Sequence, residues 1–191
     1  MADYRKAVAY VLEQEGGYSN NSHDTGGETY RGIARNFNPA WEGWKLVDSH
    51  KPFPENCTLR QISAILHTDA NLEDLVDQFY VAVYWRYESL EDQRVATKLM
   101  DLAVNMQHDG SHGPAIKILQ KAVCDQFPNV IECDAFWGQK TANAANQCNQ
   151  DELLKSMAKY AADRYATLCE KNPNLEVFRK GWLARAATLP A

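Results

Sequence analysis

Apolar residues recur along most of the chain at intervals of three and four, the spacing of one face of an α-helix. Four segments show this spacing clearly: residues 4–12, 72–83, 95–106 and 154–168. Pro114 directly follows Gly113, which is typical of the first turn of a helix, and apolar residues continue beyond it. We therefore expect at least six helices.

The only strand-like stretch lies between Tyr18 and Ile33. Gly26-Gly27 supply turn chemistry and Thr29-Tyr30 supply β-forming residues, which predicts a short hairpin. The segment from residue 35 to residue 56 contains prolines and tryptophans, and its apolar residues show no clean period. We therefore expect an irregular connection, which is able to line a cleft. Together these patterns predict a mostly α fold with a small β-hairpin.

A second break in the pattern falls at residues 89–92, between an aromatic helix that ends near Tyr84-Trp85 and a helix that begins near Gln93. The break divides the chain almost in half, and no internal repeat relates the halves. We therefore expect two domains, residues 1–92 and residues 93–191, each able to bury a core.

Composition and charge narrow the class of protein. Of the 191 residues, 45% are hydrophobic and 24% are charged, as in ordinary globular domains, so a disordered chain is excluded. No apolar run approaches the roughly 18 residues that cross a bilayer, and the first residues lack the apolar region of a cleavable signal. The 25 acidic and 20 basic residues give a net charge of −5, which argues against nucleic acid as a partner.

Five cysteines are present: Cys57, Cys124, Cys133, Cys148 and Cys169. They form no CxxC pair and no cluster with histidine at zinc spacing, so a structural zinc is not expected. Their odd number leaves at least one thiol free. Two states of the cysteines are open. They are small buried side chains in a protein made in the cytosol, or some of them, such as Cys124 with Cys133, form disulfides in an oxidising compartment.

One carboxylate stands out at the end of the first predicted helix. With each residue turned about 100° from the last, Glu15 falls in the middle of the apolar stripe and Glu13 points the opposite way. A carboxylate on an apolar face loses hydration, which favours the protonated form that a general acid needs. Gly16-Gly17 follow directly and end the helix, so the Glu15 side chain lies beside exposed backbone and not beside another helical turn. The alternative is a solvated side chain or a loop anchor.

Asp24 opens a turn-rich segment, residues 24–33, that we expect to fold back over the end of the first helix. Glycosidic cleavage needs one group that protonates the leaving oxygen and a second that activates water or stabilises positive charge at the sugar. Glu15 with an acidic or hydroxyl group of this segment, Asp24 first among them, is therefore a candidate catalytic pair. The alternatives are that Asp24 braces the hairpin and that Thr29 is a strand or turn hydroxyl. Glu28 is expected at the surface.

The residues Glu15-Gly16-Gly17-Tyr18, followed by Asp24-Thr25-Gly26-Gly27-Glu28-Thr29-Tyr30-Arg31-Gly32-Ile33, resemble the signature of the glycoside hydrolase 108 family of bacterial and phage muramidases. The resemblance implies a lysozyme-like helical catalytic domain in which Glu15 is the catalytic acid. The wider lysozyme-like superfamily often has an Asp after eight intervening residues and a Thr after five more. Glu15 and Asp24 keep the first interval, whereas only four residues separate Asp24 from Thr29.

The resemblance continues down the chain. Asp101-Leu102-Ala103-Val104-Asn105 is similar to the start of the peptidoglycan-binding region that usually follows in this family, and residues 136–141 and 181–185 are similar to later landmarks. This implies a helical peptidoglycan-binding domain over residues 93–191. One departure is that Asp-Ala-Phe-Trp-Gly at residues 134–138 replaces the more usual Asp-Gly-x-x-Gly turn, which predicts a reshaped loop after Cys133.

Aromatic rings stack on sugar faces, so several aromatic side chains are candidate substrate-binding residues. Most large aromatic side chains are core residues, and packing is the alternative for each of them. A histidine beside the proposed catalytic residues is a further candidate, with a solvated loop histidine as its alternative. The candidates are Tyr18, His23, Tyr30, Trp41, Trp44, Tyr84 and Trp85.

The resemblance implies hydrolysis of the β-1,4 bond between N-acetylmuramic acid and N-acetylglucosamine in peptidoglycan, with no metal, nucleotide or organic cofactor. The alternatives are a lytic transglycosylase that cuts the same bond, a chitinase, and a non-catalytic protein that binds the cell wall. We expect synthesis in the cytoplasm and action in the periplasm or cell wall, after delivery as a phage endolysin through a holin or as an antibacterial effector through a secretion system. An effector would have an immunity protein as a partner besides the glycan strands.

Overall fold

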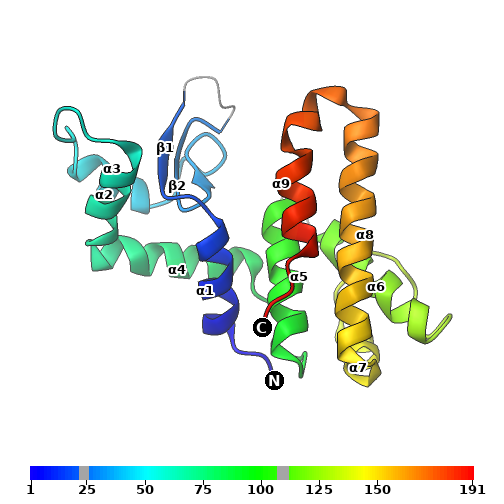
Figure 1. Ribbon diagram of the computed structural model, residues 1–191. Coiled ribbons are helices and arrows are strands. Elements are labelled where there is room, and N and C mark those ends of the chain that lie inside the picture. The colour runs from blue at the N-terminus through cyan, green and yellow to red at the C-terminus, as the bar shows by residue number, and fades with distance from the viewer. Residues whose placement is uncertain (22–25, 107–111) are drawn as a thin grey trace. The chain divides into compact units, whose positions relative to one another are not determined.

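Helices form most of the chain in the computed structural model, which describes residues 1–21, 26–106 and 112–191 (Figure 1). The α-helices of these described residues are α1 (Tyr4–Gln14), α2 (Gly43–Ser49), α3 (Leu59–His67), α4 (Ala70–Tyr84), α5 (Gln93–Met106), α6 (Gly113–Gln126), α7 (Gln139–Gln147), α8 (Gln150–Lys171) and α9 (Glu176–Ala187). A short 3-10 helix, η1 (Pro173–Leu175), joins α8 to α9. The predicted mostly α fold class is confirmed.

A small antiparallel sheet has three strands, in the order β1 (Tyr18–Asn20), β2 (Glu28–Tyr30) and β3 (Ile33–Ala34). Tyr18 pairs with Tyr30 across the first two strands, and Tyr30 pairs with Ile33 across the last two. These three side chains are buried, so one face of the sheet packs inward. The predicted hairpin is therefore present, and a third short strand extends it.

One helix, α2, falls in the segment for which the sequence predicted an irregular connection. It has only seven residues, fewer than two full turns, which is too short for a helical period to emerge from the apolar pattern. Trp44 lies buried within it, and the indole N–H of Trp44 donates to the carbonyl of Asn38 (2.8 Å). The expectation of irregular structure from residue 35 to residue 56 is therefore wrong for α2.

Contacts between Cα atoms divide the chain into two compact units. Unit 1 comprises Met1–Val11 and Tyr84–Ala191, and unit 2 comprises Leu12–Val83. The division therefore passes through α1 and through α4. The domain boundary expected after residue 92 stays a prediction.

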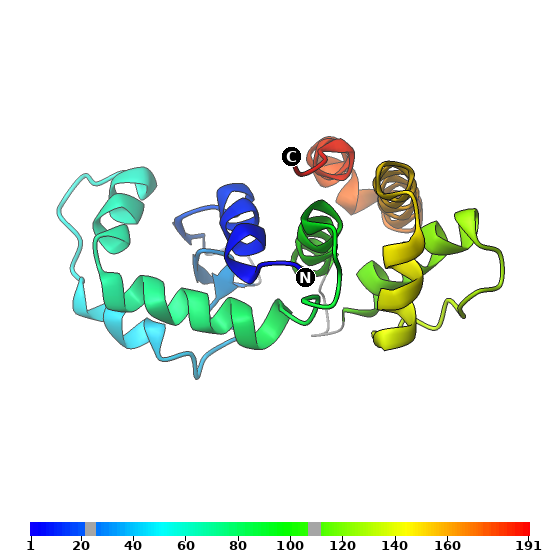
Figure 2. The ribbon, with the colours of Figure 1, turned by 90° about the horizontal axis from the view of Figure 1, so that it is seen from below.

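Unit 1 is organised around α5, in which residues 95–103 are all buried. Figure 1 shows α8 and α9 running side by side as a hairpin, and Figure 2 shows α5, α8 and α9 end-on beside one another. A lysine of α5 holds the end of α9, because the ammonium of Lys98 donates to three carbonyls there: those of Arg185 (2.9 Å), Ala186 (3.0 Å) and Thr188 (2.8 Å). Lys98 thereby caps carbonyls that the last helical turn leaves without intrahelical donors.

Asp101 partly offsets the charge of Lys98 inside unit 1. Asp101 Oδ2 lies 3.9 Å from Lys98 Nζ, and Asp101 Oδ1 accepts a hydrogen bond from Arg185 Nε (2.9 Å). Lys98 and Asp101 are both fully buried. Burial lowers the pKa of Lys98, and the charge of Asp101 opposes that shift. Because an unpaired buried charge is costly, these contacts fix α5 against α9.

The loop at residues 134–138 contains a backbone conformation that favours glycine. Ala135 has a φ of +67°, the left-handed region in which a Cβ atom is strained. The buried side chain of Gln120 holds this loop: it accepts from the N–H of Ala135 (2.9 Å) and donates to Asp134 Oδ1 (2.7 Å). The chain thus carries an alanine where the turn usual in the resembling family has a glycine.

All five cysteines are free thiols. The Sγ atoms of Cys124 and Cys133 lie 4.0 Å apart, and Cys148 and Cys169 are buried. Burial, together with the neighbouring Cys124, raises the pKa of the Cys133 thiol. A bond between Cys124 and Cys133 in an oxidising compartment stays a prediction.

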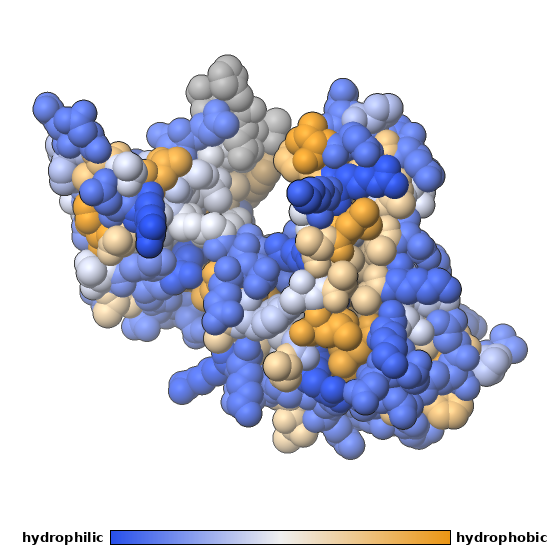
Figure 3. Space-filling view, viewed as in Figure 1, coloured by the Kyte–Doolittle hydropathy of each residue, from blue (hydrophilic) through white to orange (hydrophobic). Residues whose placement is uncertain are grey.

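Most of the face seen in Figure 3 is polar, and apolar side chains gather along α9 in unit 1. Val177 is 77% exposed there and Phe178 is 51% exposed. Among the described residues, none of the helices combines the length and the apolar character needed to span a membrane.

Candidate active site

Glu15 directly follows Gln14, the last residue of α1. Its side chain is half-buried, whereas Glu13, inside the helix, is exposed. The two carboxylates therefore differ in exposure, as expected from the apolar stripe of α1. The helix ends at this point, and Gly16 and Gly17 carry the chain on to β1.

Gly17 lets the chain after α1 pass close to α3. A Cβ atom on Gly17 would stand 2.2 Å from Ser63 Oγ, so a larger residue would force a shift. The same Oγ accepts a hydrogen bond from the N–H of Tyr18 (2.7 Å) and donates one to the carbonyl of Leu59 (2.8 Å). Ser63 therefore anchors the segment after Glu15 to α3.

The turn between β2 and β3 lies against Glu15. Arg31 and Gly32 form it with φ angles of +49° and +74°. A Cβ atom on Gly32 would stand 2.9 Å from Glu15 Oε2 and 2.9 Å from the hydroxyl oxygen of Tyr80. Tyr80 donates to the carbonyl of Arg31 (2.9 Å), and the N–H of Arg31 donates to the carbonyl of Gly17 (3.1 Å). This turn therefore packs directly on the candidate acid.

A pocket of about 500 Å³ opens beside Glu15 in unit 2. Glu15 is the only acidic side chain among the described residues that line it. Three basic side chains, those of Arg31, Arg60 and His67, line the same pocket. Its size is within the range of ligand sites, and a half-buried carboxylate in its wall is able to transfer a proton to a bound molecule.

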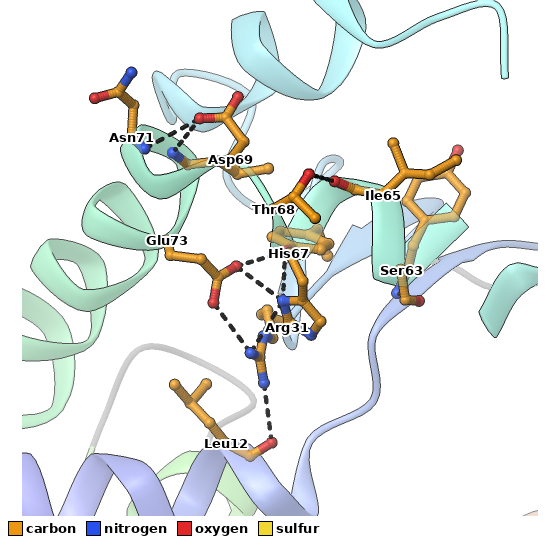
Figure 4. Close-up of polar contacts among 12 residues, drawn as sticks. Leu12, Arg31, Ser63, Ile65, His67, Thr68, Asp69, Asn71 and Glu73 are labelled. Carbon is orange, nitrogen blue, oxygen red and sulfur yellow. Dashed lines mark hydrogen bonds and ion pairs between the residues drawn. The ribbon is translucent and has the colours of Figure 1, made fainter. Parts of the chain in front are cut away.

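Figure 4 shows that polar contacts hold the side chain of Arg31. Its guanidinium donates to Glu73 Oε2 (3.0 Å) and to the carbonyl of Leu12 (3.5 Å), and Nη2 lies 3.1 Å from His67 Nδ1. Glu73 Oε1 accepts a hydrogen bond from Tyr30 (2.5 Å), and burial together with that carboxylate raises the pKa of Tyr30. Because Glu73 neutralises Arg31, these contacts fix the turn that lies against Glu15.

Glu28 is not the surface residue that the sequence predicted. Its side chain is only 10% exposed, and it accepts a hydrogen bond from the hydroxyl of Tyr18 (2.7 Å). It also forms ion pairs with Arg35 Nε (2.7 Å) and Lys51 Nζ (2.7 Å), and Arg35 donates to both carboxylate oxygens of Asp48. The expectation was wrong because these cations come from later segments that strand alternation does not describe.

Two candidate residues, His23 and Asp24, lie outside the described residues. Thr29 is described: it is half-buried in β2, and its hydroxyl donates to the carbonyl of Gly27 (3.2 Å). Thr29 is not among the residues that line the pocket beside Glu15. A role for Asp24 or Thr29 in catalysis stays a prediction.

Of the aromatic candidates in unit 2, Tyr18 lines the pocket together with Glu15. Tyr30 is fully buried and Trp44 is 3% exposed, so in this structure both rings contribute to packing. Trp41 packs edge-on against Trp44, with ring centroids 5.1 Å apart, and its indole N–H donates to the carbonyl of Leu75 (3.4 Å). Of these four aromatic residues, Tyr18 is the one that lines the pocket beside Glu15.

The two remaining aromatic candidates belong to unit 1, where each packs against other rings. Tyr84 lies over the imidazole of His112, with centroids 5.8 Å apart. Trp85 packs edge-on against Tyr4 (5.7 Å) and against Tyr87 (6.1 Å). Substrate binding by Tyr84 and Trp85 stays a prediction.

Sequence reasoning did not single out the other polar residues of the pocket. Arg31 stands inside the quoted motif, next to Gly32, so its position in the motif was the available signal. Ser63, Arg60 and His67 come from α3, and no local pattern connects them to Glu15. Only the packing of α3 beside the sheet brings them to the pocket.

Comparison with known proteins gives two family matches along the chain. Residues 8–106 match the family described as Glycosyl hydrolase 108, and residues 114–187 match the one described as Predicted Peptidoglycan domain. The solved structure of SagA from Brucella abortus is similar, with 25% sequence identity and a TM-score of 0.60, over 96% of this chain and 89% of that chain. No curated protein matches this chain.

Proposed function

The chain belongs to the glycosyl hydrolase 108 family, and on this premise we propose that it is a muramidase. The bond it hydrolyses is the β-1,4 linkage between N-acetylmuramic acid and N-acetylglucosamine in peptidoglycan. The match of residues 114–187 to a peptidoglycan domain supports the same polymer as substrate. A glycoside hydrolase that acts on peptidoglycan thus accounts for both family matches.

One observation supports Glu15 as the general acid more than any other. It is the only carboxylate among the described residues that line a pocket of about 500 Å³ in unit 2, and its side chain is half-buried. Glu13, two residues earlier, is exposed and does not line that pocket. Among the described residues, Glu15 is therefore the acidic side chain best placed to reach a glycosidic oxygen bound there.

In the proposed reaction, protonated Glu15 gives its proton to the glycosidic oxygen. The bond from that oxygen to C1 of N-acetylmuramic acid breaks as positive charge develops on the sugar ring. Water then adds its hydroxyl group to C1, and its remaining proton restores the acid. We assign the positioning of this water to Asp24, with Thr29 as the second candidate.

The neighbours of Glu15 keep its carboxylate in place. The Arg31-Gly32 turn lies against its Oε2, and Ser63 anchors the following segment to α3. Because general acid catalysis depends on the distance between acid and leaving oxygen, contacts that hold the Glu15 carboxylate in place serve catalysis. Arg31 and Ser63 are therefore assigned as positioning residues.

The proposal is tested by digesting purified peptidoglycan sacculi with the full chain and identifying the products. A muramidase releases new reducing sugar ends, each product carrying one added water. A lytic transglycosylase would give anhydro ends that are lighter by one water, and a chitinase would cleave N-acetylglucosamine polymers and leave sacculi intact. Absence of any cleavage would identify a wall-binding protein without catalytic activity.

We also propose that the protein reaches the cell wall by delivery, as a phage endolysin or as a secreted antibacterial effector. An endolysin acts together with a holin, and an effector requires an immunity protein in the cell that makes it. A neighbouring gene for one or the other distinguishes these settings.

A further inference from the structure

A second pocket, of about 360 Å³, lies between α6 and α8 in unit 1. Four cationic side chains line it, Lys117 and Lys121 from α6 and Arg164 and Lys171 from α8, against a single acid, Asp163. The chain as a whole carries a net charge of −5. This α6–α8 pocket therefore concentrates positive charge in a chain whose net charge is negative.

The spacing of these side chains sets them in two facing rows. Lys117 and Lys121 are four residues apart on α6, and Arg164 and Lys171 are seven apart on α8, so each pair projects from one face of its helix. Like charges at a spacing of four destabilise an isolated helix. An anion bound between the rows would offset this repulsion.

The cationic groups are available to a ligand. Within the described part of the chain, none of the four forms an ion pair with an acidic side chain. Lys121 Nζ lies 5.6 Å from the centroid of the Tyr160 ring, which places the ammonium beside an aromatic wall. Donors in such a pocket bind carboxylates through charge-assisted hydrogen bonds.

We propose that the α6–α8 pocket binds the peptide stems of peptidoglycan through their carboxylate groups. This inference rests on the proposed function, which makes peptidoglycan the substrate, and the pocket lies within the residues that match a peptidoglycan domain. Asp163 favours an anion that also carries an amine. The stem has a free amino group, on its diamino acid, that this carboxylate is able to pair with, whereas a phosphate polyanion has none. The ligand is thus a short peptide with several carboxylates and one amine.

The test measures binding of the full chain to sacculi by sedimentation, with Glu15→Gln in every protein so that no cleavage accompanies binding. The pocket variant is Lys117→Gln/Lys121→Gln, and its control is Lys6→Gln/Lys180→Gln, which removes the same charge from exposed positions in unit 1. Each protein is mixed with intact sacculi, and with sacculi from which an amidase has removed the peptide stems. Free stem tetrapeptide and inorganic polyphosphate serve as soluble competitors.

We expect the pocket variant to need roughly tenfold more intact sacculi than its control for half-maximal binding, and the two to be equal on stripped sacculi. We also expect the free tetrapeptide to displace the control protein. Equal binding of both proteins to intact sacculi would overturn the proposal. A deficit that persists on stripped sacculi would identify glycan as the ligand, and competition by polyphosphate alone would identify a phosphate polyanion. Because every protein lacks the Glu15 carboxylate, these outcomes do not depend on whether the chain is a muramidase.

Discussion

The carboxylate of Glu15 lies so close to Gly32 that residue 32 has no room for a side chain. A Cβ atom there would stand 2.9 Å from Glu15 Oε2, and the φ of +74° at Gly32 is one that glycine adopts without strain. The turn between β2 and β3 is thus one wall of the space that the Glu15 carboxylate occupies. A residue that takes no part in proton transfer therefore determines where the proposed acid lies.

Gly32→Ala should lower turnover roughly 10- to 100-fold, because the added methyl group displaces the Glu15 carboxylate. The positive φ should also reduce the free energy of unfolding by about 1 kcal/mol. Steady-state release of reducing ends from sacculi measures the first effect. Gly16→Ala is the control, since a Cβ atom on Gly16 has no heavy atom within 4 Å, and its turnover should stay near that of the wild type. Equal turnover in both variants would contradict the proposed contact.

Lys98→Met should reduce the free energy of unfolding by about 3 kcal/mol, because three carbonyls at the end of α9 lose their donor and Asp101 loses a neighbouring cation. Urea denaturation measures the loss. The control is Lys180→Met at an exposed position of α9, which should change stability by less than about 0.5 kcal/mol. A Lys98→Met protein as stable as this control would show that the buried ammonium does not hold α9.

Ala135→Gly should raise the free energy of unfolding by about 0.5–1 kcal/mol, because glycine relieves the strain of a φ of +67°. The same change at Ala184, an exposed residue inside α9, should lower it by about 1 kcal/mol. The two substitutions thus differ in sign. A loss of stability in Ala135→Gly, measured by urea denaturation, would disprove the strain.

Asp48 should make the stability of unit 2 depend on pH at the acid end. Hydrogen bonds from Arg35, and then from Lys51, lower the pKa of Asp48. A lowered carboxyl pKa stabilises the fold above the unfolded value of about 4, and this contribution is lost as the pH falls through the folded value. Asp48→Asn should therefore lose less stability than the wild type between about pH 5 and pH 3.

The control for this pH dependence is Asp74→Asn, at an exposed carboxylate of α4. Its loss of stability over the same range should follow that of the wild type. Urea midpoints at the two pH values compare all three proteins. Identical slopes for wild type and Asp48→Asn would show that the ion pairs of Asp48 do not contribute.

Helical periodicity was sufficient to predict the mostly α class and the different exposure of Glu13 and Glu15, because both follow from the angle between successive residues of one helix. It missed α2, whose seven residues form fewer than two turns. It also misjudged Glu28, because the burial of that side chain depends on Arg35 and Lys51 from later segments. Periodicity describes the face of one element and not what packs against it.

Only those residues of the candidate site that belong to the sequence motif could be predicted. The motif included Arg31, but His67, whose ring nitrogen lies 3.1 Å from Arg31, comes 36 residues later in the chain. Ser63 is likewise 45 residues from its partner Tyr18. Contacts at such separations arise when α3 packs beside the sheet, and no local pattern specifies that packing. The pocket itself therefore became visible only in the folded chain.

The most direct test of the proposed function is the rate at which Glu15→Gln releases reducing ends from purified sacculi. Glutamine keeps the size of the side chain and removes the acidic proton, so the rate should fall at least about 100-fold. Glu13→Gln, at the exposed position on α1, should keep the wild-type rate, and circular dichroism should show both variants folded. A folded Glu15→Gln protein that releases reducing ends at nearly the wild-type rate would contradict the assignment of Glu15 as the general acid.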